Sequence, residues 1–555
     1  MAEIVNVGLR LTATAQEDPD GIAVVEPLGR DRNGKRQYRH LTFRELDEDS
    51  SLLADGLRTL GGGPETRLVL MVRPSIDFIS LVFAMFKAGV ITVLIDPGMG
   101  RKNLIRCLEE VEPDGFVAIP LAHAVRSLLR RRFPRARLNV TVGRRWFWGG
   151  PTIRQLRARQ LSPDFQSAAT EADDPAAVIF TTGSTGPPKG VLYRHGNFNQ
   201  QVDEIRDLYD IQPGEVDLPG FPLFALFNCA MRVSTIIPDM DPTRPANVDP
   251  RNIIEAARDW NVTQAFGSPA LWNTVGRYCQ QHDVKLPTLR RVLSAGAPVP
   301  PHVLQRMKNA IHPDGDIYTP YGATESLPVA STSATEVLGE TAARSREGAG
   351  TCVGCRFPGI QWKVIRIDDG PIASIDQIDE LPCGEIGELM VKGPVVTTEY
   401  VTRTEANRLH KVQDGDGVWH RLGDVGYLDD QDRFWFCGRK SHRVLAADGP
   451  MYTIPCEAVF NQHERIYRCA LVGVGKAGEQ RPVIVAEPWS EHRPRSKKEQ
   501  EPLVDELLQL AQSNPLTSGI RDILIHSSLP VDIRHNAKIF REKLREWAAK
   551  RISKK

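Results

Sequence analysis

The chain has 555 residues, of which 41% are hydrophobic and 25% are charged, a composition typical of a globular protein rather than a disordered one. Its 70 basic and 69 acidic side chains give a net charge of +1, so no strong overall field is available to hold nucleic acid or an anionic membrane. At roughly 150 residues per domain, this length predicts about three or four folding units.

Two local groups of basic residues depart from this balance. They are the run Arg130, Arg131, Arg132 and the tail that contains Lys550, Arg551, Lys554 and Lys555. We interpret them as a solvated face and a frayed terminus. We therefore expect no nucleic-acid partner.

Neither a targeting signal nor a membrane span is expected. The first residues, MAEIVNVGLRLTATAQEDPD, contain no apolar core of the signal-peptide type. The most hydrophobic region, 68–95, is interrupted by Arg73, Asp77 and Lys87, so no uncharged run approaches the roughly 20 residues of a transmembrane segment. This region predicts a buried helix followed by a strand. Together these features predict a soluble cytoplasmic protein.

The nine cysteines are an odd number scattered over a long chain, which argues against a disulfide framework. Cys352 and Cys355 form a C-x-x-C pair, but zinc would need two further ligands with matching spacing, and the neighbouring sequence offers none. We interpret the pair as two small buried thiols.

Short apolar runs that predict strands alternate with stretches that predict helices. The strand candidates are 67–72, 91–95, 177–182, 264–266 and 291–294. The helix candidates are 75–87, 252–260 and 301–311. This alternation indicates βαβ crossovers and largely parallel sheets, so the expected fold class is α/β.

Past about residue 350 the pattern changes. Residues 359–369 and 384–392 are short β-rich segments with glycine turns, which predict a small barrel or an antiparallel layer. A mixed α+β pattern follows and ends in a charged amphipathic helix at 539–552, and the segment 491–501 predicts an exposed loop. We expect a large N-terminal domain of layered βαβ sheets at 1–438, with a small β-rich subdomain at about 350–438, and a small mobile α+β C-terminal domain at 439–555.

The stretch TTGSTGPPKG, residues 181–190, follows an apolar strand and concentrates hydroxyls, glycines and a lysine. Glycines let backbone N–H groups turn toward a ligand, and Lys189 adds a mobile positive charge. This combination suits a polyphosphate, although it is not the Walker pattern, because no G-x-x-x-x-G-K-[ST] is present. A Ser/Thr/Gly surface turn is the alternative for such a loop taken alone.

The loop resembles the signature of the adenylate-forming superfamily, which includes acyl-CoA synthetases, the adenylation domains of peptide synthetases, and luciferases. Further matches follow in the family's order along most of the chain: Lys87-Ala88-Gly89 with Asp96-Pro97, Tyr321-Gly322-Ala323-Thr324-Glu325, Gly384 to Leu389, Arg421-Leu422-Gly423-Asp424, Gly438-Arg439, and Asn536-Ala537-Lys538-Ile539. One such match could be chance, whereas six matches in the correct order are specific to this superfamily.

The resemblance implies an ATP-dependent reaction in two halves. A carboxylate attacks the α-phosphate of Mg-ATP and gives acyl-AMP and pyrophosphate, and a second nucleophile then displaces AMP. Because the first half crowds anionic oxygens together, preorganised positive charges and N–H donors should dominate its catalysis.

The same resemblance implies a role for each matched residue. The β- and γ-phosphates would be held by the loop residues Thr181, Thr182, Gly183, Ser184, Thr185, Gly186 and Lys189. Glu325 would bind Mg²⁺, a hard cation that takes oxygen ligands, and Thr324 would contact the α-phosphate. Lys538 would reach from the C-terminal domain to the reacting carboxylate and neutralise charge in the transition state.

The remaining matched residues are implied to hold adenosine. Tyr321 would stack on adenine, beside Gly322 and the backbone of the segment that contains Gly296 and Ala297. Asp424 would accept hydrogen bonds from both ribose hydroxyls, and Arg439 would support the ribose or the phosphate.

Several departures from the family pattern bear on the second half-reaction. Where thioester-forming members commonly have P-L-F-H, this chain has Pro222-Leu223-Phe224-Ala225. The hinge position two residues after Arg439, commonly Asp or Lys, is Ser441, and Leu445 replaces the lysine of an I-K pair. These losses weaken the case for coenzyme A and leave adenylation intact.

The stretches at 530–544 and 96–103 resemble one branch of the superfamily, the β-lactone synthetases of bacterial long-chain olefin biosynthesis. That resemblance implies a long-chain β-hydroxy acid substrate, a 2-alkyl-3-hydroxyalkanoic acid, whose own 3-hydroxyl attacks the acyl carbon and expels AMP to close a cis- or trans-β-lactone. An intramolecular nucleophile needs no coenzyme A tunnel. The resemblance alone implies assembly with other olefin-biosynthesis enzymes.

The main alternative is a long-chain fatty acyl-CoA ligase, followed by an acyl carrier-protein loading enzyme and a non-catalytic nucleotide-binding scaffold. A general base for the hydroxyl stays open: His195 and His535 lie near motifs, but a lone histidine is more often structural. The apolar residues 221–227, Phe266 and Trp272 could line an acyl pocket, and core packing explains them equally well.

Overall fold

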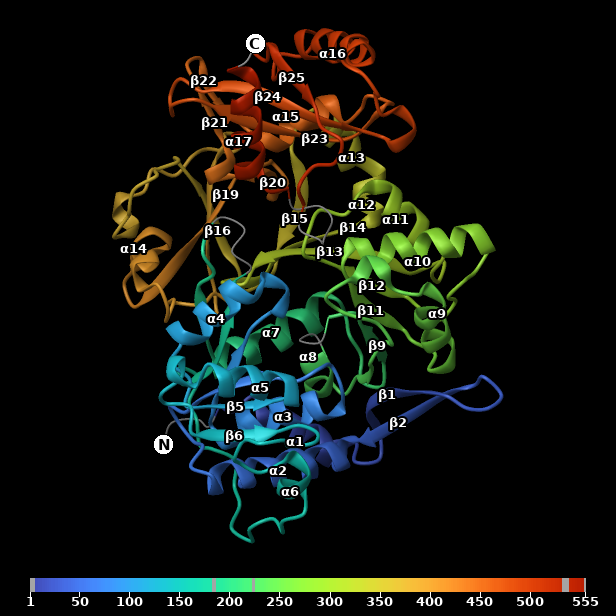
Figure 1. Ribbon diagram of the computed structural model, residues 1–555, viewed down its shortest axis with the longest axis vertical. Helices are drawn as coiled ribbons and strands as arrows, with labels where there is room; N and C mark the ends of the chain where they lie inside the picture. The colour runs from blue at the N-terminus through green and yellow to red at the C-terminus, as the bar shows by residue number, and fades with distance from the viewer. Residues whose placement is uncertain (1–4, 182–185, 222–224, 532–538, 554–555) are drawn as a thin grey trace.

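The computed structural model of the chain describes residues 5–181, 186–221, 225–531 and 539–553 (Figure 1). Two large sheets with their covering helices form the lower part of the molecule in Figure 1, and a smaller sheet with its own helices lies at the top. The α/β class expected from the sequence is confirmed.

The first sheet has six strands in the order β6-β5-β3-β4-β7-β8. They are β3 (Arg67–Met71), β4 (Ile91–Leu94), β5 (Gly115–Ala118), β6 (Leu138–Thr141), β7 (Pro175–Phe180) and β8 (Gly190–Arg194). All neighbours are parallel except β7 and β8, which are antiparallel. The phosphate loop is therefore the connection between two adjacent antiparallel strands, and not the link between a strand and a helix.

Helices cover both faces of this sheet. One face packs on α1 (Gly8–Glu17), α2 (Phe43–Thr59) and α3 (Ile76–Ala88), and the other on α4 (Arg101–Glu110) and α5 (Pro120–Leu128). The short helix α6 (Ile153–Arg157) packs beside α2. The hydrophobic region 68–95 is a strand, a buried helix and a second strand, which confirms the expected buried helix followed by a strand. Within the described ranges, no helix combines enough length and hydrophobicity to cross a membrane.

Helix α3 explains the early family match at Lys87. The Ser75 hydroxyl accepts a hydrogen bond from the Phe78 amide at 3.2 Å and caps the start of the helix, and Gly89 ends it with a φ of 79°. Lys87 is fully buried, and its Nζ lies 2.6 Å from Asp47 Oδ1 on α2. A buried ammonium needs such a partner, so this lysine ties two helices together rather than facing a ligand.

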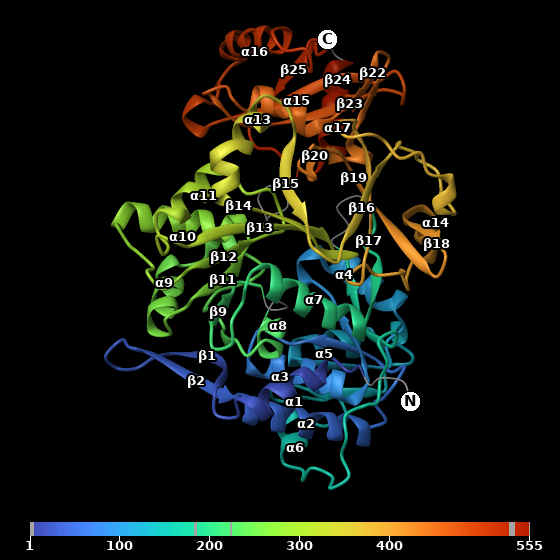
Figure 2. The same cartoon turned by 180° about the vertical axis from the view of Figure 1, so that it is seen from behind.

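The second sheet has fourteen strands, and in its first half the neighbours are parallel except for the first two strands, which form an antiparallel hairpin. Its N-terminal members are β1 (Ile22–Arg30), β2 (Arg36–Thr42), β9 (Val216–Pro219), β10 (Ser234–Ile236), β11 (Gln264–Gly267), β12 (Arg291–Ser294), β13 (Asp316–Ala323) and β14 (Ser326–Ser333). The β1–β2 hairpin projects from the side of the molecule (Figure 2). One face packs on α9 (Pro250–Asp259), α10 (Pro269–His282) and α11 (Pro301–Lys308), and α7 (His195–Leu208) contributes to the core on the other.

From β13 onward the same sheet is antiparallel. Its remaining members are β15 (Thr351–Arg356), β16 (Gln361–Ile365), β17 (Gly387–Lys392), β18 (Lys411–Asp414), β19 (Gly417–Leu428) and β20 (Arg433–Arg439). The antiparallel layer expected past residue 350 is present. It is not a separate sheet, because β15 pairs with β14 and continues the large sheet.

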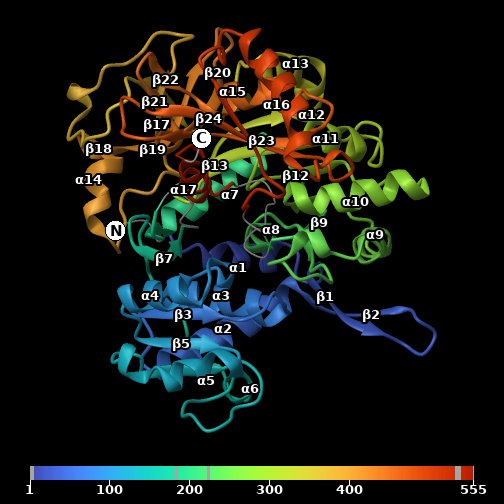
Figure 3. The ribbon, with the colours of Figure 1, turned by 45° about the horizontal axis from the view of Figure 1, so that its top comes forward.

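After Arg439 a three-stranded sheet forms from β23 (Ile466–Val474), β24 (Arg481–Pro488) and β25 (Asp522–Ile525). It packs with α15 (Thr453–Phe460), α16 (Lys497–Gln512) and α17 (Arg541–Ile552) around two apolar clusters of its own. This C-terminal unit is seen from above in Figure 3. A domain boundary at residue 439 stays a prediction.

Two expectations are wrong in detail. The segment 491–501 is not wholly a loop, because α16 starts at Lys497 where the Ser496 hydroxyl accepts a hydrogen bond from the Glu499 amide at 3.3 Å. This serine three residues before a glutamate is a helix-start signal. Cys352 is buried as expected, but Cys355 is exposed at the end of β15, and all nine cysteines are free thiols.

Candidate active site

The described ends of the phosphate loop are held together by Thr181 and Lys189. The Thr181 amide donates to the Lys189 carbonyl at 3.0 Å, and the Lys189 amide donates to the Thr181 hydroxyl at 3.1 Å. Gly186 lies in the exposed turn between them, and Thr182, Gly183, Ser184 and Thr185 lie outside the described residues. The loop therefore leaves the sheet and returns to it at one closed point, from which the Lys189 side chain projects.

Lys189 projects onto Tyr400, a residue that sequence reasoning missed. The Lys189 Nζ lies 3.3 Å from the Tyr400 hydroxyl and 4.4 Å from the centre of its ring. Burial lowers the pKa of Lys189, and Glu325 opposes that shift. A cation held against a tyrosine ring and hydroxyl is fixed in place while it remains available to an anion.

Tyr400 also holds Glu325. The Tyr400 hydroxyl donates to Glu325 Oε1 at 2.5 Å, and both side chains are buried. The backbone carbonyl of Glu325 accepts from the Thr397 amide at 2.9 Å and from the Thr397 hydroxyl at 3.0 Å. The neighbouring Thr324 carbonyl accepts from the Tyr193 hydroxyl at 2.6 Å. Four contacts from two separate chain segments, 397–400 and β8, thus fix the carboxylate and the backbone next to it.

A second group brings together Tyr321, Asp424 and Arg439. One Asp424 carboxylate oxygen accepts from the Tyr321 hydroxyl and the other from the Arg439 guanidinium, whose same nitrogen also donates to the Leu422 carbonyl at 3.2 Å. The Tyr321 ring lies near Phe434 and Phe436 on β20. Burial and Asp424 raise the pKa of Tyr321 well above its usual value, so this hydroxyl stays protonated.

The charged residues around Tyr400 and those around Asp424 lie close enough to shift one another's pKa values. Arg439 lowers the pKa of Lys189, while Asp424 first and Glu325 to a smaller extent raise the pKa of Arg439. The sheet explains this proximity, because Tyr321 lies near the end of β13, Asp424 lies on β19 and Arg439 ends β20, and these strands belong to one continuous sheet.

The segment expected to flank adenine lies on the neighbouring strand. Gly296 and Ala297 follow β12, which is parallel to β13, and the adjacent Ala295 packs against the same apolar cluster as Tyr321. Gly296 has a φ of 94°, which favours glycine. At Gly322 a Cβ atom would lie 2.5 Å from the Ser326 carbonyl, so the turn between β13 and β14 needs a glycine there.

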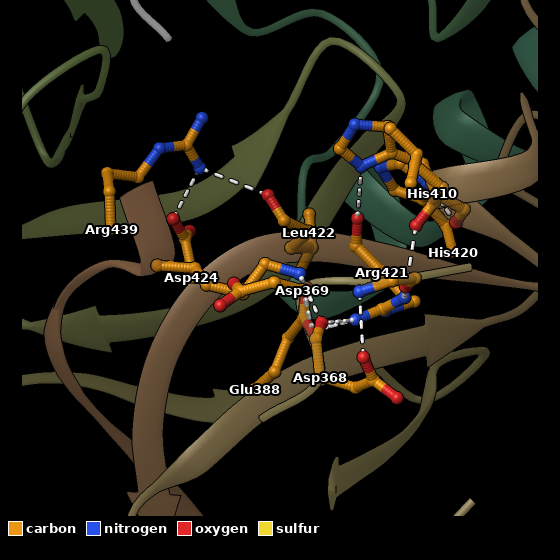
Figure 4. A network of polar contacts seen from close by, with 12 residues as sticks. Asp368, Asp369, Glu388, His410, His420, Arg421, Leu422, Asp424 and Arg439 are labelled. Carbon is orange, nitrogen blue, oxygen red and sulfur yellow. Dashed lines mark hydrogen bonds and ion pairs between the residues drawn. The ribbon is translucent and has the colours of Figure 1, made fainter. Parts of the chain in front are cut away.

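Beneath this site lies a buried ion pair between Arg421 and Glu388, shown in Figure 4. Both side chains are inaccessible to solvent, and the Arg421 Nη2 lies 2.6 Å from Glu388 Oε2. Arg421 also donates to the carbonyls of Asp368, Gly370 and Leu409. The two motifs that contain Glu388 and Arg421 therefore supply a buried structural pair, and only Asp424 of the second motif faces the site.

Lys440 connects this pair to the C-terminal unit. Its Nζ lies 2.9 Å from Glu388 Oε1 and 3.0 Å from the Asp368 carbonyl. Because Lys440 directly follows Arg439, the first residue past the expected hinge arginine is anchored on a buried carboxylate. Ser441 is exposed next to it, and Leu445 lies on β21 (Val444–Ala446), where its amide donates to Gln480 Oε1 at 2.8 Å.

Lys411 is a second functional candidate that sequence reasoning missed. It is buried, donates to the Thr397 carbonyl and lies 5.4 Å from the Tyr400 ring centre. Burial lowers the pKa of Lys411 to about 7, although Glu325 opposes that shift. The hydrogen bonds from Lys411 to Thr397 and from Thr397 to Glu325 end on the backbone carbonyl of Glu325, so Lys411 supports the backbone that carries the carboxylate.

Two other candidates lie in the core. His195 is fully buried, its Nδ1 accepts from the Val7 amide at 3.2 Å, and burial lowers its pKa to about 4. Trp272 is buried on α10 and donates its indole N–H to the Leu293 carbonyl at 3.3 Å. Phe266 packs in the same apolar cluster as Tyr321 and Ala295, so its place in an acyl pocket stays a prediction.

Several predicted residues lie outside the described ranges. Lys538 and His535 are among them, as are Pro222, Leu223 and Phe224. Their expected roles stay predictions.

Comparison with known proteins defines the class. Residues 11–401 match the family model described as AMP-binding enzyme. This match covers well over half of the chain, and the chain belongs to the AMP-binding enzyme family.

The most informative relatives are two curated proteins named olefin beta-lactone synthetase. The chain is 46% identical to that of Xanthomonas campestris pv. campestris over 99% of its own length and 98% of the relative. It is 45% identical to that of Stenotrophomonas maltophilia over 99% of each chain. A feruloyl-CoA synthase of Amycolatopsis is 26% identical over 78% of this chain and 80% of the relative.

Solved structures agree with the fold. ATP-bound MatB from Rhodopseudomonas palustris superposes with a TM-score of 0.76 at 19% identity, covering 99% of both chains. The amide bond synthetase McbA from Marinactinospora thermotolerans superposes with a TM-score of 0.77 at 20% identity, covering 98% of this chain and 100% of that one. At these identities, the likeness supports the two-part α/β architecture.

Proposed function

We propose that the protein is an AMP-forming ligase that converts a 2-alkyl-3-hydroxyalkanoic acid into a β-lactone with consumption of ATP. The observation that carries this proposal is the identity of 46% and 45%, over nearly the whole chain, with two olefin beta-lactone synthetases. The coenzyme A-dependent relatives are more distant, at 24–26% identity over about four-fifths of the chain.

The first half-reaction requires a nucleotide site, and the group around Asp424 suits adenosine. The Asp424 carboxylate, fixed by Tyr321 and Arg439, is a hydrogen-bond acceptor that suits two ribose hydroxyls. The Tyr321 ring would stack on adenine, and the backbone at Gly296 and Ala297 would lie beside it. Lys189 and Arg439 would face the phosphates, because both are cations in one electrostatic field.

Glu325 fits the part of a magnesium ligand. It is a buried carboxylate whose position is set by Tyr400, and Mg²⁺ takes one or two carboxylates when substrate phosphates and waters complete its octahedron. When bound, the ion would neutralise phosphate charge. Thr324 would contact the α-phosphate beside it.

The chemistry balances in two steps. A substrate carboxylate oxygen forms a bond to the α-phosphorus while the bond to pyrophosphate breaks. The 3-hydroxyl oxygen then bonds to the acyl carbon, the bond from that carbon to AMP breaks, and the hydroxyl proton leaves. Lys538 would neutralise charge in the first step, and domain rotation about Arg439 would separate the two steps.

The substrate class and the partners follow from the same relatives. Two long alkyl chains need an apolar cavity, and the segment around Phe227 lies between two apolar clusters of the N-terminal part. We also propose assembly with other enzymes that make the hydroxy acid or consume the lactone, because a strained and water-insoluble product favours direct transfer.

A pair of substrates tests the proposal. With ATP, Mg²⁺ and no coenzyme A, the 2-alkyl-3-hydroxy acid should release AMP over many turnovers. The matched 2-alkyl acid without the 3-hydroxyl should stop after one equivalent of pyrophosphate, because its acyl-AMP has no internal nucleophile. Many turnovers with both acids, or with neither, would contradict intramolecular displacement.

A further inference from the structure

Positive charge is concentrated in one segment of this nearly neutral chain. Residues 115–163 contain eleven arginines and no aspartate, glutamate or lysine, whereas the whole chain carries a net charge of +1. The segment spans β5, α5, β6, α6 and the loops between them. Such a block is not explained by the adenylation site, whose described residues lie elsewhere.

Helix α5 in this segment turns an apolar stripe to solvent. Leu121 is 64% exposed, Val125 44% and Leu128 82%. Their spacing of four and three residues puts them on one face of the helix. On another face His123 is buried, so the exposed stripe is not the side on which α5 packs.

A loop after β6 adds two large aromatic side chains. Trp146 is 54% exposed and Phe147 is 73% exposed. The next residue, Trp148, is buried, stacks on His123 of α5 at 5.5 Å between ring centres, and donates its indole N–H to Thr141 at 2.8 Å. The loop is therefore anchored to α5, and its aromatic side chains belong to the same region of surface.

Exposed arginines follow α5 and precede the two exposed aromatic residues in the sequence. Arg130, Arg131 and Arg144 are exposed, and none makes an ion pair within the part of the chain that the structure describes. Arg132 has only an exposed pair with Glu109 at 3.3 Å, and Arg145 donates to the Gly150 carbonyl at 2.6 Å. These guanidinium groups keep their charge available for an anionic partner.

We propose that this α5 surface, made of Leu121, Val125, Leu128, Trp146, Phe147 and the arginines at 130–132 and 144–145, docks on an anionic lipid bilayer. Exposed aliphatic side chains would enter the boundary between headgroups and acyl chains, where tryptophan is also favoured. The arginines would bind lipid phosphates while their stems cover apolar surface. The run at 130–132 is then part of a docking surface and not merely a solvated face.

The apolar stripe favours a bilayer over nucleic acid. Arginines and aromatic rings could hold a single strand, but an aliphatic stripe of three residues has no role in binding phosphates and bases. Exposed apolar side chains combined with basic ones are the composition of membrane-surface segments. A protein partner with an acidic rim is the remaining alternative. Binding of such a partner without binding of vesicles would distinguish it from a bilayer.

The position of the α5 surface suits an enzyme with a mobile lid. In Figures 1 and 3, α5 lies on the part of the molecule away from α15, α16 and α17. Docking through α5 would leave the C-terminal unit in water. An acid with two long alkyl chains is poorly soluble, so this placement would keep the enzyme where such a substrate accumulates.

Vesicle sedimentation with the full-length protein tests the proposal. The wild type should bind vesicles of equal parts phosphatidylglycerol and phosphatidylcholine, and bind pure phosphatidylcholine and high-salt samples more weakly. The charge variant carries Arg130→Gln, Arg131→Gln and Arg144→Gln, and the apolar variant carries Trp146→Ser and Phe147→Ser. Each should weaken binding by about tenfold or more.

A matched control lies on the β1–β2 hairpin. There Leu28 is 62% exposed and Arg32 is also exposed, so Leu28→Ser with Arg32→Gln removes one apolar and one basic group elsewhere. This control should bind vesicles like the wild type. All variants should keep the wild-type thermal midpoint and rate of AMP release on a soluble short-chain hydroxy acid, which separates docking from folding and from the proposed reaction.

Three results would overturn the proposal. They are absence of wild-type binding to the anionic vesicles, equal binding by the wild type and both α5 variants, and α5-dependent capture of an oligonucleotide or a partner enzyme without vesicle binding.

Discussion

The Tyr400 hydroxyl donates a hydrogen bond to Glu325 Oε1 at 2.5 Å. The same hydroxyl lies 3.3 Å from Lys189 Nζ, so one tyrosine positions both the carboxylate proposed to bind metal and the lysine proposed to bind phosphate. Tyr400 is buried, and the Lys411 ammonium also lies 5.4 Å from the centre of its ring. A site for a charged nucleotide is thus preorganised by a residue that is itself neutral.

Replacing Tyr400 by Phe tests this arrangement. The ring would still lie against Lys189, but the hydrogen bond from Lys189 to the hydroxyl and the one from the hydroxyl to Glu325 would both be lost. Such support of a metal ligand is typically worth about 10- to 100-fold, so the Mg²⁺ concentration for half-maximal pyrophosphate exchange should rise by that factor. Isothermal titration of Mg²⁺ into the enzyme–ATP mixture should give the same shift.

The control for this change is Tyr278→Phe, which removes a hydroxyl from α10 at a position stacked on His282. It should leave the Mg²⁺ dependence unchanged. An unaltered Mg²⁺ dependence in Tyr400→Phe would show that Glu325 does not depend on this tyrosine.

Asp424→Asn should weaken ATP binding. The carboxylate receives hydrogen bonds from both Tyr321 and Arg439, and an amide cannot accept both without turning its NH₂ group toward one donor. Charge-assisted hydrogen bonds contribute about 1.5–3 kcal/mol, so the Kd for ATP should rise by about 10- to 100-fold. Calorimetric titration measures this Kd. The control is Asp430→Asn, on the exposed turn after β19, which should bind ATP like the wild type.

Glu388→Gln should destabilise the protein. Arg421 would be left as a buried charge without its counterion, which typically costs about 3–5 kcal/mol. The exposed pair of Lys363 with Glu380 provides the control, because Glu380→Gln should cost less than about 1 kcal/mol. Urea unfolding followed by tryptophan fluorescence compares the two, and equal midpoints would mean that the buried pair contributes no more than the surface pair.

The stability of the fold should depend on pH through His195. Burial lowers its pKa from 6.5 to about 4, so between these values the unfolded chain binds more protons than the folded one. The contribution of neutral His195 to the free energy of unfolding is therefore fully present above pH 6.5 and is lost as the pH drops toward 4. His195→Asn keeps a polar group near the Val7 amide and removes the titration, so its urea midpoint should fall less steeply over this window. Parallel curves would contradict the assignment.

Much of the N-terminal fold could be predicted because its parallel strands are continuous apolar runs. The strand at Arg291–Ser294 matches the prediction at both ends, and β4 and β11 match within one residue. The start of α16 was missed because charged residues and Pro494 outweighed the Ser496 capping signal. The ends of helices and strands are predicted from a few neighbouring residues, so a prediction fails where those residues carry opposing signals.

The site was only partly predictable. Tyr321, Asp424 and Arg439 stood out through their motifs, and the structure brings them together. Tyr400 is 75 residues from Glu325 in the sequence. Neither Tyr400 nor Lys411 lies in a sequence motif that predicts a binding site. Tyr400 and Lys411 reach Glu325 only because the start of β14, β18 and the segment before α14 (Asn407–His410) pack together. Lys87 shows the converse, because a motif residue proved to be a buried support for α2.

The most direct test of the central claim is the mass of the product formed from a 2-alkyl-3-hydroxy acid, ATP and Mg²⁺, with and without coenzyme A. The expected product is lighter than the acid by one water in both reactions, with AMP released in equal amount. A product heavier by the coenzyme A thioester, formed only when coenzyme A is present, would contradict it.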